Sequence, residues 1–249
     1  MLLAPKWLAK MDFIFMLTRN DQTVSDAHQV YDTLRDTGLR YVGFKDIGLP
    51  PSELRQLAAT MRADGREVFL EVVSERADDE LRSVEAALDI GVDWLMGGTH
   101  ADDALAILDK VGPPGTPGRP KYCPFPGRVI DHPSILEGSI EEISQSAHDL
   151  TARPGVDGLD LLAYRWQGDV PSLVRSVVDS ATGPIIAAGS VDSAERIEAL
   201  AKAGAWAFTI GGAIFDRRLP AGDTVREQVE CALAMSAAAG GREVVADGA

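Results

Sequence analysis

Two short apolar runs end in small residues near the C-terminus: Pro184-Ile185-Ile186-Ala187-Ala188-Gly189-Ser190 and Trp206-Ala207-Phe208-Thr209-Ile210-Gly211-Gly212. Each run has the length of a fully buried β-strand, and an amphipathic helical stretch follows each of them. A buried strand that leads through a small-residue turn into a helix is typical of a βα unit in a parallel sheet.

The same unit recurs along the whole chain. Six further apolar runs precede these two, over residues 13–17, 41–45, 68–72, 94–96, 121–123 and 159–164. The predicted helices span residues 25–36, 52–63, 78–90, 101–110, 140–150, 171–180, 193–203 and 224–235. Eight βα units in 249 residues predict a single (β/α)8 TIM barrel, for which about 250 residues is typical. An open doubly wound sheet is the alternative.

Composition and charge restrict the protein's partners and its compartment. The formal net charge of −14 disfavours nucleic acid and anionic membranes as partners. Two cysteines far apart in sequence indicate no disulfide framework, and no apolar run reaches the roughly 18 residues of a membrane span. We expect a cytoplasmic barrel domain over residues 1–249, with residues 1–11 capping the barrel floor and residues 237–249 forming a tail. A homodimer is compatible with the sequence.

The glycines after the last two runs predict an anion site. Small residues let backbone N–H groups approach an anion, and a helix that starts there adds unpaired donors. Barrels often bind phosphate between the loops that follow strands seven and eight, at a short extra helix, which residues 213–216 can supply. The alternative is that these glycines only permit tight turns. The predicted phosphate-binding residues are Gly189, Ser190, Gly211 and Gly212.

Residues 184–193 and 203–215 resemble the closing half of the ribulose-phosphate-binding barrels. That superfamily includes sugar-phosphate epimerases, barrels of histidine and tryptophan biosynthesis, and phosphosugar decarboxylases. The resemblance implies a shared phosphate site and leaves the reaction open, because the superfamily varies its chemistry on one scaffold. The first half lacks the Asp-x-Lys-x-x-Asp pattern of the decarboxylases, whereas Gly43-Phe44-Lys45-Asp46 is similar to the Lys-containing strand end of N-acylmannosamine-6-phosphate epimerases.

Two ionisable side chains end neighbouring strands of the predicted barrel, Lys45 and Glu71. Adjacent strands lie about 4.8 Å apart, so the two side chains can converge if both point inward. A Lys–Glu pair can move a proton on a carbon next to a carbonyl group. Lys45 can instead form a Schiff base, or the pair can be a structural salt bridge at the barrel rim.

Other strand ends supply further candidates. Asp46 can orient Lys45 or bind a sugar hydroxyl, and His100 can be an acid or base or can cap the helix after it. Arg19 and Arg165 can hold a phosphate or carboxylate, and Tyr164 can support a sugar or pack in the core. Asp21 is interpreted as a turn residue, and residues 127–138 as a long loop over the site. No His, Asp or Glu spacing predicts a metal site, and no cofactor is expected.

These features predict an isomerase or epimerase of a phosphorylated sugar or related small phosphometabolite. The alternatives are a lyase, either a Schiff-base aldolase or a decarboxylase, and a non-catalytic barrel that binds a phosphometabolite.

Overall fold

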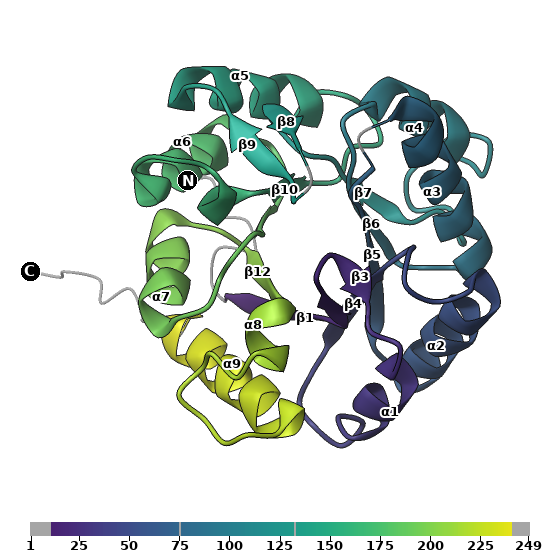
Figure 1. The fold of residues 1–249 in the computed structure, drawn as a ribbon. Helices are drawn as coiled ribbons and strands as arrows, with labels where there is room; N and C mark the ends of the chain where they lie inside the picture. The colour runs from purple at the N-terminus through teal and green to yellow at the C-terminus, as the bar shows by residue number, and fades with distance from the viewer. Residues whose placement is uncertain (1–10, 75, 132, 241–249) are drawn as a thin grey trace, which may run out of the picture.

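The computed structural model describes residues 11–74, 76–131 and 133–240. Eight parallel strands in these ranges form a nearly closed (β/α)8 barrel, which confirms the predicted fold (Figure 1). The barrel strands are β1 (Asp12–Met16), β4 (Tyr41–Lys45), β5 (Glu67–Val72), β6 (Trp94–Gly97), β7 (Lys121–Cys123), β10 (Leu159–Leu161), β11 (Ile185–Ala187) and β12 (Ala207–Ile210).

The strands follow one another around the ring in chain order. The hydrogen-bonded order is β10-β11-β12-β1-β4-β5-β6-β7, so β12 lies beside β1. Ile186 pairs with Ala207 and Ala187 with Phe208, so Ile186 and Phe208 lie on adjacent strands, as the sequence predicts. The short crossovers between consecutive strands are those of sequential βα units.

Individual hydrogen bonds, and no regular ladder, close the ring between β7 and β10 in the described residues. The Asp157 N–H donates to the Tyr122 carbonyl at 2.8 Å, and the Asp160 N–H donates to the Pro124 carbonyl at 3.1 Å. The second of these hydrogen bonds fixes the backbone of Asp160 in the barrel wall.

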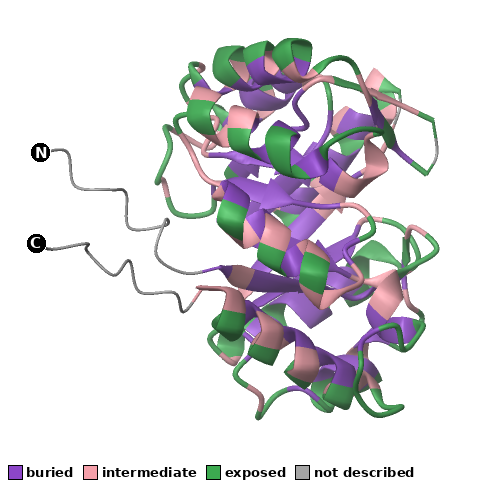
Figure 2. Ribbon diagram, turned by 90° about the vertical axis from the view of Figure 1, so that its left-hand side faces the viewer, coloured by how far each residue is buried: buried purple, intermediate pink, exposed green. Residues whose placement is uncertain are grey.

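Helices surround the strands, and Figure 2 shows the buried strands between half-exposed helices. The helices are α1 (Ala27–Asp32), α2 (Pro51–Ala63), α3 (Ala77–Ile90), α4 (Ala101–Leu108), α5 (Ile140–Thr151), α6 (Val170–Ser180), α7 (Ala194–Ala203), α8 (Gly212–Phe215) and α9 (Val225–Gly240). Here α8 is the short extra helix predicted near residues 213–216.

Three predicted boundaries differ from the structure by three residues or more. The sixth predicted strand, over residues 159–164, ends at Leu161, and residues 163–165 form a 3-10 turn. α1 ends at Asp32 instead of residue 36, where the Thr33 and Thr37 hydroxyls donate to the Val30 and Leu34 carbonyls and compete with regular helix bonding. α9 continues to Gly240, so residues 237–240 of the expected tail are helical, consistent with three consecutive alanines there. Residues 241–249, and residues 1–10 of the expected cap, lie outside the described residues.

Two small hairpins stand in segments that the sequence predicts as loops. One joins β2 (Thr18–Arg19) to β3 (Gln22–Thr23), and the other joins β8 (Arg128–Ile130) to β9 (Ile135–Glu137). Strands of two or three residues carry too little alternation to be recognised in a sequence. Both hairpins follow barrel strands at the carboxyl end of the barrel.

Aromatic side chains fill the barrel interior below that end. Phe69 stacks on Trp94 with ring centroids 5.1 Å apart, and Trp94 stacks on Trp206 at 5.2 Å. Tyr41 meets both Phe69 and Trp206 edge-on at 5.7 Å. This aromatic layer packs the barrel interior, and open space lies at the strand ends.

Candidate active site

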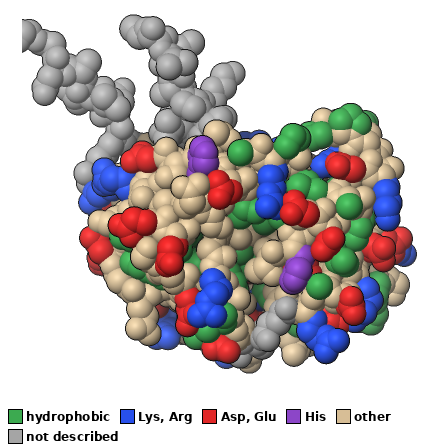
Figure 3. Space-filling view, turned by 90° about the horizontal axis from the view of Figure 1, so that it is seen from above, with side chains coloured by type: hydrophobic (Ala, Val, Ile, Leu, Met, Phe, Trp, Pro, Cys, Tyr) green, Lys and Arg blue, Asp and Glu red, His purple; other side chains and the backbone are tan. Residues whose placement is uncertain are grey.

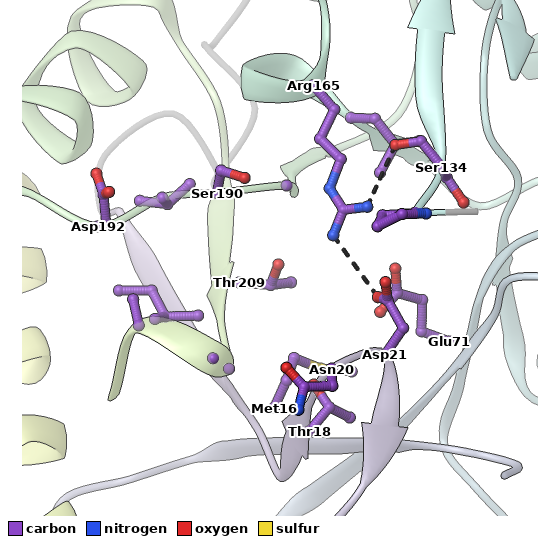
Figure 4. A pocket seen from close by; sticks show the side chains of 18 of the residues that line it. Met16, Thr18, Asn20, Asp21, Glu71, Ser134, Arg165, Ser190, Asp192 and Thr209 are labelled. Atoms are coloured by element: carbon purple, nitrogen blue, oxygen red, sulfur yellow. Dashed lines mark hydrogen bonds and ion pairs between the residues drawn. The ribbon is translucent and has the colours of Figure 1, made fainter. Parts of the chain in front are cut away.

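A pocket of about 340 Å³ opens at the carboxyl ends of the barrel strands (Figure 4). Its wall combines the β2–β3 hairpin with the ends of β4, β5, β11 and β12, so segments from both halves of the chain meet there. The polar residues that line it are Thr18, Asn20, Asp21, Lys45, Glu71, Ser134, Arg165, Ser190, Asp192, Thr209, Asp216 and Arg218. This is the face on which barrels place their active sites.

Lys45 is a buried cation held between two carboxylates. Its Nζ lies 2.6 Å from Asp21 Oδ1 and 3.7 Å from Glu71 Oε2, and its side chain is 4% exposed. Lys45 and Glu71 are paired in register on β4 and β5, which brings their side chains to one face of the sheet. The convergence expected from the sequence is therefore present, but the closer partner of Lys45 is Asp21.

The β2–β3 hairpin brings Asp21 to this position. Asn20 and Asp21 have φ values of 52° and 57°, the left-handed pair that a two-residue hairpin requires and that Asn and Asp tolerate well. The Thr23 hydroxyl donates to the Lys45 carbonyl at 2.7 Å and accepts from the Lys45 N–H at 3.0 Å, which fixes the hairpin to β4. Asp21 is thus a turn residue, as expected, and also a partner of Lys45, which the sequence does not indicate.

Arg165 approaches Asp21 from the opposite side of the pocket. It is the last residue of a single 3-10 turn, η2 (Ala163–Arg165). Its guanidinium lies 3.6 Å from Asp21 Oδ1 and donates to the Ser134 carbonyl at 3.3 Å, as the dashed lines in Figure 4 show. Gly189 makes this possible, because a Cβ there would lie 2.6 Å from the Arg165 Cγ. Gly189 therefore provides space for Arg165 as well as a tight turn.

The predicted phosphate-binding residues all line the pocket: Gly189, Ser190, Gly211 and Gly212. Gly211 and Gly212 have different roles, however. A Cβ on Gly211 would lie 2.6 Å from the Thr18 Oγ1, so Gly211 allows close packing of β12 against the hairpin. A Cβ on Gly212 would meet nothing within 4 Å, so Gly212 borders open space.

Arg218 adds a cation to this end of the pocket. It lies just beyond α8 and lines the pocket with the glycine turns. Its side chain makes no ion pair with another described residue. No sequence pattern marks Arg218, because an isolated arginine after a helix is ordinary surface composition.

Four other predicted residues do not line the pocket. His100 has its Nδ1 2.8 Å from the buried Glu80 and borders a separate pocket near α4 and α5, and it does not cap α4 with its side chain. Asp46 accepts a hydrogen bond from the Ser83 hydroxyl, and Tyr164 donates to the Arg196 carbonyl at 3.3 Å. Arg19 forms an ion pair at 2.8 Å with Asp216, which does border the pocket.

One ionisable residue of the barrel interior, Asp160, is not among the site residues that the sequence predicts. Asp160 is the middle residue of β10 and is completely buried, and neither carboxylate oxygen has a hydrogen-bond partner among the described residues. Burial raises the pKa of Asp160 well above its ordinary value, and repulsion from Glu71 adds to the increase, whereas Lys45 opposes it. A lone acidic residue inside an otherwise apolar strand is the signal that identifies it.

Three further properties concern metal ions, membranes and the charges on the surface. Within residues 11–74, 76–131 and 133–240, no group of three or more His, Cys, Asp or Glu side chains is arranged to hold a metal ion. No helix in the described part of the chain is both long and apolar enough to cross a bilayer. On the face shown in Figure 3, acidic and basic side chains are interspersed.

Comparison with known proteins supports the fold. No family model matches the sequence, and no curated protein matches it. The orotidine 5'-phosphate decarboxylase of Pyrococcus horikoshii OT3 superposes with a TM-score of 0.59 at 15% identity, over 90% of this chain and 97% of that one. A structure described as native KDPGal gives 0.58 at 13% identity, over 94% and 98%.

A third solved structure is a regulatory protein. The glycerol uptake operon antiterminator regulatory protein of Listeria monocytogenes gives a TM-score of 0.54 at 16% identity, over 81% of this chain and 91% of that one. At these identities the likenesses establish one shared architecture, the (β/α)8 barrel.

Proposed function

We propose that this protein is an enzyme that isomerises or epimerises a phosphorylated sugar or a related small phosphometabolite. The observation that carries the proposal is one pocket that joins two kinds of group. The glycine turns after β11 and β12, with Arg218, border one part of it, and the Lys45–Glu71 pair borders another. A phosphorylated substrate needs both, an anion site to hold it and an acid–base pair for its carbon skeleton.

The chemistry follows from the charges of the pair. Glu71 removes a proton from the carbon next to the carbonyl group, and the electron pair moves to the carbonyl oxygen to form an enediolate. Lys45 stabilises the negative charge on that oxygen. In an isomerase, the hydroxyl proton of the enediolate moves to the other oxygen and Glu71 returns its proton to the neighbouring carbon. In an epimerase, a second acid protonates the original carbon from the opposite face.

The surroundings of Lys45 favour this role over a Schiff base. An amine attacks a carbonyl carbon only in its neutral form. Lys45 is instead an ion-pair partner, with Asp21 at 2.6 Å and Glu71 at 3.7 Å. Attack on a carbonyl carbon would require Lys45 to lose its proton first, and the neutral amine would no longer balance the charges of the two largely buried carboxylates beside it, which costs free energy.

A lyase is the second candidate. It is favoured by the barrel that carries the name orotidine 5'-phosphate decarboxylase, and by the resemblance of residues 184–193 and 203–215 to a superfamily that contains such enzymes. A barrel that only binds its phosphometabolite is the third, favoured by the structural likeness to an antiterminator regulatory protein.

Incubation with a panel of sugar phosphates in D2O separates the three candidates. We expect NMR spectroscopy to detect deuterium at the carbon next to a carbonyl group, with the carbon skeleton intact. Release of a carbonyl fragment or of CO2 would support the lyase instead, and borohydride trapping of a substrate on Lys45 would identify an aldolase. Binding without turnover across the panel would support the third candidate.

A Gly212→Val substitution tests the phosphate end of the pocket. Because an added Cβ meets nothing within 4 Å, the side chain should fit without strain and fill the space where the anion lies. We expect affinity for inorganic phosphate, measured by calorimetry, to fall at least tenfold. Gly38→Val is the matched control, since Gly38 is also free of neighbours within 4 Å but does not line the pocket.

Equal phosphate affinity in the wild type and Gly212→Val would contradict a phosphate at this position. Gly211→Val is the poorer test, because its side chain would clash with Thr18 and change the packing of the hairpin.

A further inference from the structure

Asp160 points into the barrel, beneath the pocket. Its neighbours Leu159 and Leu161 belong to the core between the strands and the helices, and side chains alternate along a strand, so Asp160 faces the opposite way. Its register partner Ile186 belongs to the cluster that fills the barrel interior. Two residues further along the chain, Leu162 lines the pocket, whereas Asp160 does not.

The ionisable groups around Asp160 come from several elements. Glu71 on β5 repels its negative charge and Lys45 on β4 attracts it. The buried Cys123 thiol on β7 is also near, since Asp160 contributes to raising the pKa of that thiol. β11 and β6 carry no ionisable side chain, and η2 contributes Tyr164 and Arg165.

The charges of the four side chains that meet around Lys45 cancel without Asp160. Lys45 and Arg165 are positive, Asp21 and Glu71 are negative, and contacts of 2.6 to 3.7 Å connect them. An ionised Asp160 would therefore add a negative charge that has no counterion, in an apolar interior and with neither oxygen hydrogen-bonded within the described part of the chain. Such a charge is costly, whereas a neutral carboxyl group is tolerated.

We propose that Asp160 is a positioning residue for Glu71: the buried Asp160 carboxyl group carries a proton, which removes a negative charge from beneath the pocket and lets Glu71 stay ionised there. Glu71 is the better site for the negative charge, since it borders the pocket and lies beside Lys45.

The proton on Asp160 matters for the proposed reaction. The enediolate formed above it is itself negative, and a second negative charge beneath it would oppose its formation. The role of Glu71 as the base rests on the proposed function, whereas the protonation of Asp160 does not. A measurement on the protein without substrate therefore tests the two separately.

The experiment is a carboxyl titration by NMR on the full chain labelled with ¹³C at the Asp and Glu carboxyl groups. We expect one Asp carboxyl group to remain protonated at pH 7 and to be missing from the spectrum of Asp160→Asn. In Glu71→Gln, the midpoint of Asp160 should fall by about one pH unit or more, because the repulsion is gone. In Asp46→Asn, the matched control, it should not move, since Asp46 binds Ser83 outside the pocket.

Two results would overturn the proposal. One is an Asp160 carboxyl group that titrates in the ordinary range of aspartates, about pH 2 to 5. The other is a midpoint that is the same in the wild type and in Glu71→Gln, which would mean that the charge of Glu71 does not act on the protonation of Asp160.

Stability against pH gives a second readout. Because the pKa of Asp160 is raised in the folded state, the folded chain keeps a proton that the unfolded chain releases above about pH 4. The contribution of Asp160 to the stability of the folded state is full below the pKa that this residue has in the unfolded chain. It is lost as the pH rises through the pKa that the residue has in the folded chain, and the unfolding constant rises by up to about tenfold per pH unit in that range. Asp160→Asn should lack this component, and equal slopes in the two proteins would contradict the proposal.

Discussion

Lys45→Met and Glu71→Gln are each expected to lower turnover by about two to four orders of magnitude, the range typical of acid–base groups. Lys45→Met removes the charge that stabilises the enediolate, and Glu71→Gln removes the base while keeping the shape of the side chain. The measurement is kcat and kcat/KM on the sugar phosphate identified by deuterium exchange. The double variant should lose much less than the product of the two single effects, because the residues act as a unit.

Asp46→Asn provides the kinetic control. Asp46 follows Lys45 in the chain but points to Ser83 and does not line the pocket, so its loss should leave turnover within a few-fold of the wild type. Near-normal turnover in both Lys45→Met and Glu71→Gln would reduce the pair to a structural salt bridge. The acid–base role would then have to lie with other residues that line the pocket, above all Asp21.

The two variants should differ in stability. A salt bridge at an exposed rim contributes little, but Lys45 is 4% exposed, and its loss removes the cation nearest to Asp21 and the cation beside Glu71. Removing one partner of a buried pair typically costs about 3–5 kcal/mol. Glu71→Gln should cost less, because Lys45 keeps Asp21 at 2.6 Å. The folded fraction of each variant therefore has to be measured beside its kinetics.

The sequence predicts the barrel because the strands are buried on both sides. Apolar runs such as residues 41–45 and 121–123 stand out against the amphipathic helices between them, and the structure has strands at both places. The two hairpins escape prediction because they contribute no apolar run. Hairpins form around turns with suitable backbone angles, such as the turn at Asn20 and Asp21. Only the three-dimensional structure shows which residues the hairpins contact.

The candidate site is predicted from the sequence only in part, because the strand pattern marks some of its residues and not others. Alternation along the strands places Lys45 and Glu71 inward, and the structure brings them together. Asp21 reaches Lys45 only through the left-handed turn, and Arg218 reaches the pocket only through the end of α8. His100 follows a barrel strand too, but its side chain turns to Glu80, a residue of the helix before that strand.

Phe69→Ala is expected to destabilise the protein by about 3–5 kcal/mol, the range found for large-to-small changes at buried aromatic residues. Phe69 is completely buried, stacks on Trp94 with centroids 5.1 Å apart and an interplanar angle of 7°, and meets Tyr41 edge-on at 5.7 Å. The wall around the cavity is a ring of hydrogen-bonded strands, which resists collapse into the vacated space. Urea unfolding followed by circular dichroism measures the loss.

Phe69→Leu is the matched variant for this test, because it keeps an apolar side chain and leaves a smaller cavity. It should lose clearly less than Phe69→Ala, since the cost grows with the volume left empty. Phe69 also lies two residues before Glu71 on the same face of β5, so a cavity there removes packing beneath the proposed base. Equal losses in the two variants would show that the barrel relaxes around the gap, and the aromatic layer would then not be a rigid floor for the site.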